Sequence, residues 1–70
     1  MTKKELELNL ILSGFVIKKY LVTKYYSYKD LELLFTQDKK SVGYIINSKG
    51  KQVYKTYDDM MARVAMEIEL

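Results

Sequence analysis

The sequence predicts a single α+β domain, with an antiparallel meander of three to four strands flanked by an N-terminal and a C-terminal helix. Three observations predict it. Capping patterns stand near both ends of the chain, alternating apolar residues bounded by turn residues fill its middle, and 70 residues suffice for one domain. Because no internal repeat, low-complexity segment or proline-rich linker interrupts the sequence, we expect residues 1–70 to form this one domain.

The first segment is predicted to be a helix. Thr2 is followed three residues later by Glu5, which is the pattern of a capping box. Leucines recur at i,i+4 spacing through residues 6–12, and Gly14 suits the left-handed position that ends many helices. The same leucines also alternate, as they would in a strand. The helix is favoured because the signals at both ends agree.

Residues 15–28 are rich in β-branched and aromatic side chains, which favours a strand that bends near Lys24. A second helix is the alternative, because Ile17, Leu21 and Lys24 also have helical spacing.

Apolar and other side chains alternate in two further segments, residues 31–36 and 42–47. Turn residues separate them at 38–40 and follow them at 47–51, where a glycine is able to take positive φ. A third short strand is expected to begin at Val53. Together these segments predict antiparallel strands in sequence order.

Gly43 lies inside one of these predicted strands. Glycine weakens a strand interior, so its presence indicates a bulge or a close approach by another backbone.

The last segment is predicted to be a helix that lies on one face of the sheet. Thr56 suits the N-cap position, and Asp59 stands three residues later, as in a capping box with Asp in place of Glu. Arg63 and Glu67 are expected to form an outward i,i+4 pair. An apolar stripe of this helix comprises Met60, Val64 and Ile68.

The composition argues against an enzyme and against a cofactor. The chain has no histidine and no cysteine, so it lacks the commonest general base, the commonest covalent nucleophile and the usual zinc ligands. Ser41 follows Lys40, but neighbours in a turn usually point apart. Asp58 and Asp59 are adjacent on a helix and do not face each other, so they are expected to complement the helix dipole rather than hold a metal. The lack of cysteine and of a long apolar run leads us to expect a cytoplasmic protein without membrane contact.

Basic charge and aromatic rings share the middle of the chain. Residues 16–56 hold nine lysines against three acidic residues, a balance of +6, whereas residues 57–70 have a balance of −3. All seven tyrosines lie between Tyr20 and Tyr57. The candidate partner- or nucleic-acid-binding residues are Lys18, Lys19, Tyr20, Lys24, Tyr25, Tyr26, Tyr28 and Lys29. Residues of the meander that accompany them are Tyr44, Tyr54, Lys55 and Tyr57.

Three interpretations of these tyrosines are ordered by how common each role is. Core and cross-strand packing comes first, a protein interface second and base stacking on nucleic acid third. The short length, the lack of catalytic groups and the lysine, isoleucine and tyrosine bias resemble small proteins carried by phages and mobile elements of AT-rich bacteria. This resemblance implies binding and blocking of a host protein.

The sequence therefore predicts a non-catalytic protein-binding module that occupies or inhibits a partner protein, through complementarity with an acidic surface. A core of this size is marginal, so self-association as a homodimer is also expected. One alternative is a nucleic-acid-binding module that uses a Lys/Tyr-rich sheet face, and another is a structural subunit of an assembly.

Overall fold

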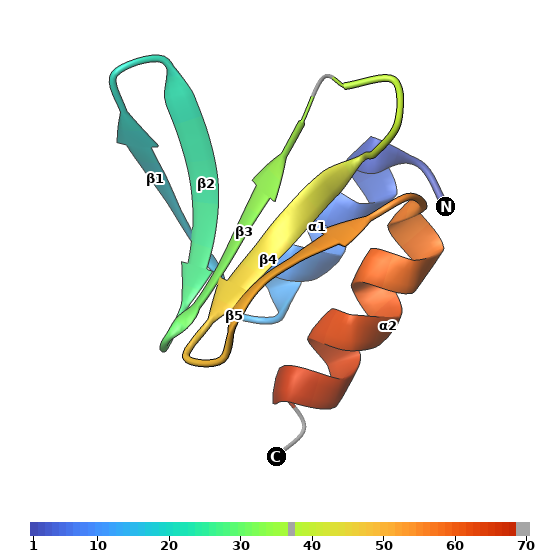
Figure 1. Ribbon diagram of the computed structural model, residues 1–70. Coiled ribbons are helices and arrows are strands. Elements are labelled where there is room, and N and C mark those ends of the chain that lie inside the picture. Colours follow the sequence, from blue (N-terminus) through green and yellow to red (C-terminus); the bar gives the residue numbers. More distant parts are fainter. Residues whose placement is uncertain (37, 69–70) are drawn as a thin grey trace.

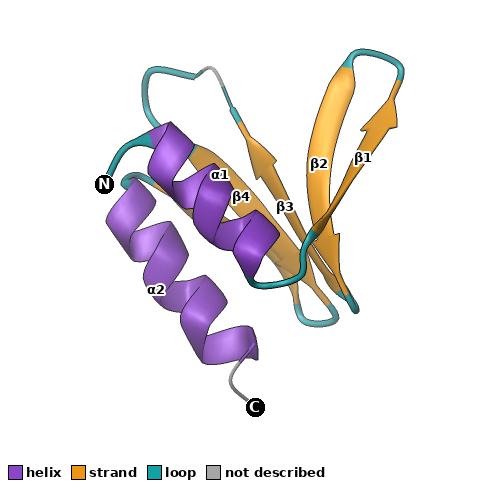
Figure 2. Ribbon diagram, turned by 180° about the vertical axis from the view of Figure 1, so that it is seen from behind, coloured by secondary structure: helices purple, strands orange, loops and turns teal. Residues whose placement is uncertain are grey.

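The computed structural model describes residues 1–36 and 38–68 of the chain. Along the chain it has the elements α1 (Lys3–Leu12), β1 (Val16–Tyr20), β2 (Thr23–Tyr28), β3 (Leu31–Phe35), β4 (Gly43–Asn47), β5 (Gly50–Tyr54) and α2 (Tyr57–Ile68). The strands pair as an antiparallel meander in the order β1-β2-β3-β4-β5. Both helices lie on one face of this sheet, and they run side by side in the same direction (Figures 1 and 2).

The predicted α+β class is confirmed, although the described residues form five strands rather than three or four. The additional strand comes from residues 15–28, which form the hairpin of β1 and β2 instead of one bent strand. Its turn is made of Leu21 and Val22, and the φ angle of Leu21 is 58°. The prediction missed this turn because neither residue is one of the turn formers that a sequence pattern reveals.

The predicted N-terminal helix is confirmed, together with its capping box. The Thr2 backbone N–H donates to Glu5 Oε1 at 2.9 Å, and the Glu5 N–H donates to Thr2 Oγ1 at 3.2 Å. Gly14 has a φ of 100°, and the Phe15 N–H donates to the Leu10 carbonyl at 3.0 Å. This is a Schellman ending, in which the two hydrophobic residues it brings together, Phe15 and Leu10, are both buried.

The second predicted turn is also confirmed, but the strand after it begins earlier than expected. Asn47 Oδ1 accepts a hydrogen bond from the Lys49 N–H at 2.9 Å, and Gly50 has a φ of 127°. Gly50 itself starts β5, so Val53 lies near the end of the strand and not at its beginning. The start was placed too late because residues 50–52 lack the apolar pattern by which strands are recognised.

Gly43 is explained by a close approach, as predicted. A Cβ atom added there would lie 2.4 Å from the Leu34 carbonyl oxygen and 2.5 Å from the Met60 Cε. The methyl group of α2 therefore packs directly onto the sheet at this point, and a larger side chain would separate helix from strand. The core between helices and sheet comprises Leu6, Leu10, Phe15, Tyr26, Leu31, Leu33, Ile45, Tyr54, Met60 and Val64.

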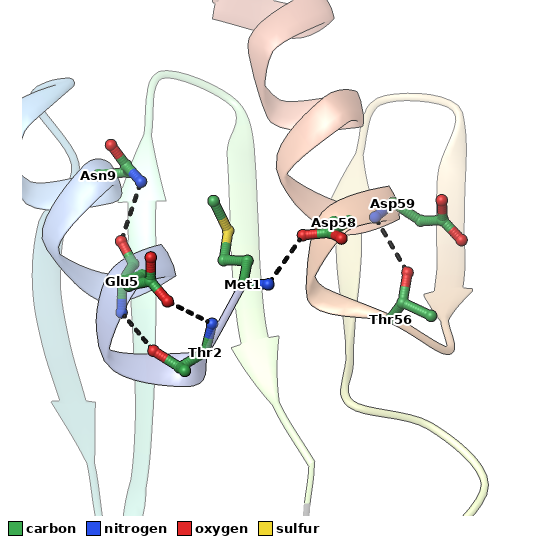
Figure 3. A network of polar contacts seen from close by, with 7 residues as sticks. All are labelled: Met1, Thr2, Glu5, Asn9, Thr56, Asp58 and Asp59. Carbon is green, nitrogen blue, oxygen red and sulfur yellow. Dashed lines mark hydrogen bonds and ion pairs between the residues drawn. The ribbon is translucent and has the colours of Figure 1, made fainter.

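The two helices begin next to each other, and polar contacts hold both starts (Figure 3). Thr56 caps α2 by accepting a hydrogen bond from the Asp59 N–H at 3.1 Å, as predicted. The N-terminal amine of Met1 lies 3.2 Å from Asp58 Oδ1 and so connects the two starts. Acidic side chains at these positions also oppose the positive ends of the helix dipoles.

The Arg63–Glu67 pair is present at 3.0 Å, but it does not project outward as expected. Both side chains are about two-thirds covered, and Asn47 Nδ2 donates to Glu67 Oε1 at 3.5 Å. The pair therefore lies against the β4–β5 end of the sheet, because α2 turns this face toward the turn at Asn47. Glu69, which contributed to the predicted acidic end, lies outside the described residues. In the described parts of the chain, neither helix combines the length and the apolar character that crossing a bilayer requires.

Candidate binding surface

One face of the sheet is covered by the helices and the other is open (Figure 1). In the register of the sheet, Tyr25 of β2 lies opposite Leu34 of β3, which lies opposite Tyr44 of β4. Side chains of directly opposed residues share a face, and sequence neighbours point to opposite faces. The neighbours of these three residues are buried under the helices: Tyr26, Leu33 and Ile45. The row of Tyr25, Leu34 and Tyr44 therefore lies on the open face.

The open face is hollowed. The hollow has a volume of about 330 Å³ and is lined by Tyr20, Thr23, Tyr25, Glu32, Leu34, Tyr44 and Ile46. Its shape follows from the pairing of β2, which matches β3 only over Tyr25–Tyr28. The turn end of the β1–β2 hairpin, which does not pair with β3, leans away from that strand (Figure 1). Tyr20 thereby forms one wall of the hollow.

The charges around this hollow are mainly positive. Lys18 lies opposite Tyr25 on the open face, and the Lys51 Nζ stands 4.5 Å from the centroid of the Tyr44 ring. Glu32 contributes a carboxylate to the lining. The hollow thus combines an apolar and aromatic floor with lysines at its margins, which is the composition of a binding surface for an apolar group with acidic neighbours.

The structure divides the residues predicted to bind a partner between the two faces of the sheet. The open face has Lys18, Tyr20 and Tyr25. By the alternation of the strands, the opposite face has Lys19, Lys24, Tyr26 and Tyr28. Lys29 lies in the turn after β2, where its φ is 55° and its Nζ is 5.5 Å from the Tyr28 ring centroid. These residues therefore do not form one continuous surface.

Tyr26 and Tyr28 serve packing within the domain. The Tyr26 ring is 1% exposed and meets the Phe35 ring edge-on, with 5.5 Å between the centroids. The Tyr28 ring is half-buried and lies 5.3 Å from the Phe15 ring. Neither ring is free to stack on a ligand, whereas Tyr20 is 69% exposed.

The Tyr26 hydroxyl belongs to a polar cluster between α1 and β2. It donates a hydrogen bond to Glu7 Oε2, and the Lys24 Nζ lies 3.5 Å from the same oxygen. The hydrogen bond from Tyr26 lowers the pKa of Glu7, and burial raises the pKa of Tyr26. The hydrogen bond favours the ionised form of Glu7 and the protonated form of Tyr26, and it ties α1 to β2.

Within residues 1–36 and 38–68, the groups considered for chemistry are the carboxylates and Ser41. No three acidic side chains gather there in a way that would hold a metal ion. Ser41 Oγ lies 3.0 Å from Thr36 Oγ1, and the Lys40 N–H donates to Asp38 Oδ1 at 3.0 Å. These are contacts of turn residues, and they leave Ser41 without a base beside it in the described contacts.

Leu34 and Ile46 line the hollow but were not among the predicted binding residues. A signal for them exists in the sequence. Strands with one solvated face alternate apolar and polar residues, whereas Leu33 and Leu34, and likewise Ile45 and Ile46, are apolar neighbours. Such apolar neighbours place apolar side chains on both faces of the sheet.

No protein-family model matches the chain, and neither a curated protein nor a solved structure has significant similarity to it.

Proposed function

We propose that the chain is a non-catalytic protein-binding module whose contact surface is the open face of the sheet. The observation that supports this is the hollow with Tyr25, Leu34 and Tyr44 on its floor. Apolar and aromatic side chains concentrated on an uncovered face are typical of interaction sites, and tyrosine is enriched where single residues dominate binding. The module would act by occupying the surface of its partner.

The partner is expected to insert an apolar side chain into the hollow and to place acidic groups around it. Lys18 and Lys51 stand at the margins of the hollow, where they would meet such acidic groups. Complementary charges of this kind raise the rate of association and select the partner. Two copies of this face would bring lysines together, which favours a different protein over a second copy of the chain.

A protein partner is favoured over nucleic acid for two reasons. The phosphate backbone of a nucleic acid that lies across the hollow would meet the Glu32 carboxylate, whereas a protein partner can place its acidic groups only at the margins, near the lysines. In addition, the Lys51 ammonium group already stands over the Tyr44 ring, which a base would need for stacking. The aliphatic side chains of Leu34 and Ile46 complete a floor that suits an apolar side chain better than a row of bases.

Site-specific photocrosslinking in cells tests the proposal. A photoreactive phenylalanine analogue is placed at Tyr44 in the hollow and, in a control variant, at Met66, which is exposed on α2. We expect a discrete protein adduct from position 44 that is absent from position 66. Equal adduct patterns from both positions would contradict the proposal, and so would adducts to nucleic acid alone from position 44.

A further inference from the structure

The turn of the β1–β2 hairpin exposes two aliphatic side chains at its apex. Leu21 is 85% exposed and Val22 is 98% exposed. The apex stands away from the helices and from β3 (Figures 1 and 2). Both apolar side chains therefore project into solvent at the tip. Their transfer from water into an apolar medium would gain nearly their full transfer free energy.

Leucine at the first turn position is also unfavourable for folding. Leu21 has a φ of 58°, a region that favours glycine, asparagine or aspartate. Two-residue hairpin turns with positive φ at the first central residue ordinarily place glycine there. Neither packing nor backbone geometry thus explains an aliphatic residue at this position, and strained residues of this kind cluster at functional sites.

Lysines lie on both faces of the two hairpin strands, close to the apex. Lys18 points to the open face of the sheet, whereas Lys19 and Lys24 are paired partners that point to the opposite face. All three lie within roughly 10 Å of the apex at about 3.3 Å per residue. Residues 8–29 contain no acidic residue, and Glu7 of α1 lies 3.5 Å from the Lys24 Nζ.

We propose that this hairpin tip inserts into the surface of an anionic lipid bilayer. Leu21 and Val22 enter the boundary between headgroups and acyl chains, Tyr20 lies at headgroup level, and the lysines contact lipid phosphates. When the tip of the hairpin meets a flat anionic surface, the lysines on both faces of the hairpin lie near that surface. A protein groove that contacts one face of the hairpin would use only Lys18, or only Lys19 and Lys24. Such surface binding combines apolar insertion with attraction to anionic lipids and needs no membrane-spanning segment. The proposal thereby replaces the expectation of no membrane contact, which rested on the lack of a long apolar run in the sequence.

Vesicle co-sedimentation of the full chain tests this proposal. The vesicles contain either phosphatidylcholine alone or an equimolar mixture of phosphatidylcholine and phosphatidylglycerol. We expect binding to the mixed vesicles that weakens with added salt, and much weaker binding to the neutral ones. Replacing both apex residues, as Leu21→Gly with Val22→Thr, is expected to abolish sedimentation, and circular dichroism is expected to show that this variant keeps its fold.

Charge variants distinguish a specific role of the hairpin lysines from a general effect of the net charge of the chain. Lys18→Gln with Lys19→Gln is expected to weaken binding about 25-fold at low salt, from about a fivefold loss per lysine. The matched control removes two lysines in the turn between β3 and β4, as Lys39→Gln with Lys40→Gln, and is expected to bind like the original chain. Equal losses in both pairs, no binding to the mixed vesicles, or full binding by the folded apex variant would each overturn the proposal. Lys18 also belongs to the proposed protein-binding surface, but vesicle binding is measured without a protein partner, and the apex variant leaves the hollow and its lysines unchanged. A failure of vesicle binding is therefore distinguishable from a failure of the proposed protein-binding function.

Discussion

The Tyr26 hydroxyl donates a hydrogen bond to the Glu7 carboxylate and thereby ties α1 to β2 across nineteen positions of the sequence. The Tyr26 ring is part of the core, while its hydroxyl reaches the edge where Lys24 approaches the same carboxylate. One side chain therefore serves both as a packing residue and as the donor that satisfies a carboxylate. This contact accounts for one of the seven tyrosines without any role in binding.

Removal of this hydroxyl is expected to destabilise the fold. Tyr26→Phe retains the ring and loses the hydrogen bond to an ionised group, so we expect the free energy of unfolding to fall by about 2 kcal/mol. Urea denaturation measures the change. Tyr25→Phe is the control, because its ring lies on the open face, and it is expected to change stability by less than about 0.5 kcal/mol. Equal effects of the two substitutions would show that the contact contributes nothing.

Acid is expected to weaken the same contact. The hydrogen bond from Tyr26 and the nearby Lys24 hold the pKa of Glu7 below its ordinary value of 4.5. A carboxylate with a lowered folded-state pKa stabilises the fold above pH 4.5, and this contribution is lost as the pH falls through the folded-state pKa. Glu7→Gln retains an acceptor without the charge, so the decline of unfolding free energy below pH 4.5 is expected to be shallower. Identical declines in the two proteins would contradict this assignment.

Gly43→Ala is expected to lower the free energy of unfolding by about 2 kcal/mol or more. The added methyl group would meet the Leu34 carbonyl oxygen and the Met60 Cε, and the oxygen belongs to the backbone of β3, which cannot shift as easily as the end of a flexible side chain. Thermal and urea unfolding measure the effect. At Gly50 no atom lies within 4 Å of an added group, so Gly50→Ala measures the cost of a positive φ alone, about 1–3 kcal/mol. Gly43 has no positive φ, so a loss below about 1 kcal/mol in Gly43→Ala would refute the close-packing explanation.

Leu21→Gly is expected to leave the domain as stable as before, or more stable by up to about 1 kcal/mol. Relief of the positive φ favours the variant by about 1–2 kcal/mol, and the larger chain entropy of glycine offsets part of this gain. Chemical denaturation of the single variant tests the expectation. A loss of more than about 1 kcal/mol would mean that the Leu21 side chain supports the fold, and it would remove the argument for a strained apex.

Sequence patterns predicted the parts of the fold that local chemistry determines. Thr2 with Glu5 and Thr56 with Asp59 identified both helix starts, because capping depends on neighbouring residues alone. Gly43 revealed a close contact for a similar reason, since few positions in a strand require glycine. The hairpin at Leu21 was missed because its turn contradicts ordinary turn chemistry.

The candidate binding surface was less predictable because it depends on tertiary arrangement. Alternation indicates that Tyr25 and Tyr26 point to opposite faces, but not which face the helices cover. The hollow itself requires the hairpin to lean away from β3, and no local pattern in the sequence encodes that curvature. The apolar neighbours Leu33 and Leu34 were the available signal that both faces of β3 carry apolar side chains.

The affinity of the crosslinked partner for variants of the hollow tests the central claim most directly. Titration calorimetry compares the original chain with Tyr44→Ser and with the control Met66→Ser, an exposed position on α2. A binding surface on the open face predicts a Kd at least about tenfold higher for Tyr44→Ser and an unchanged Kd for Met66→Ser. Equal Kd values for the original chain and Tyr44→Ser, with both proteins folded, would contradict it.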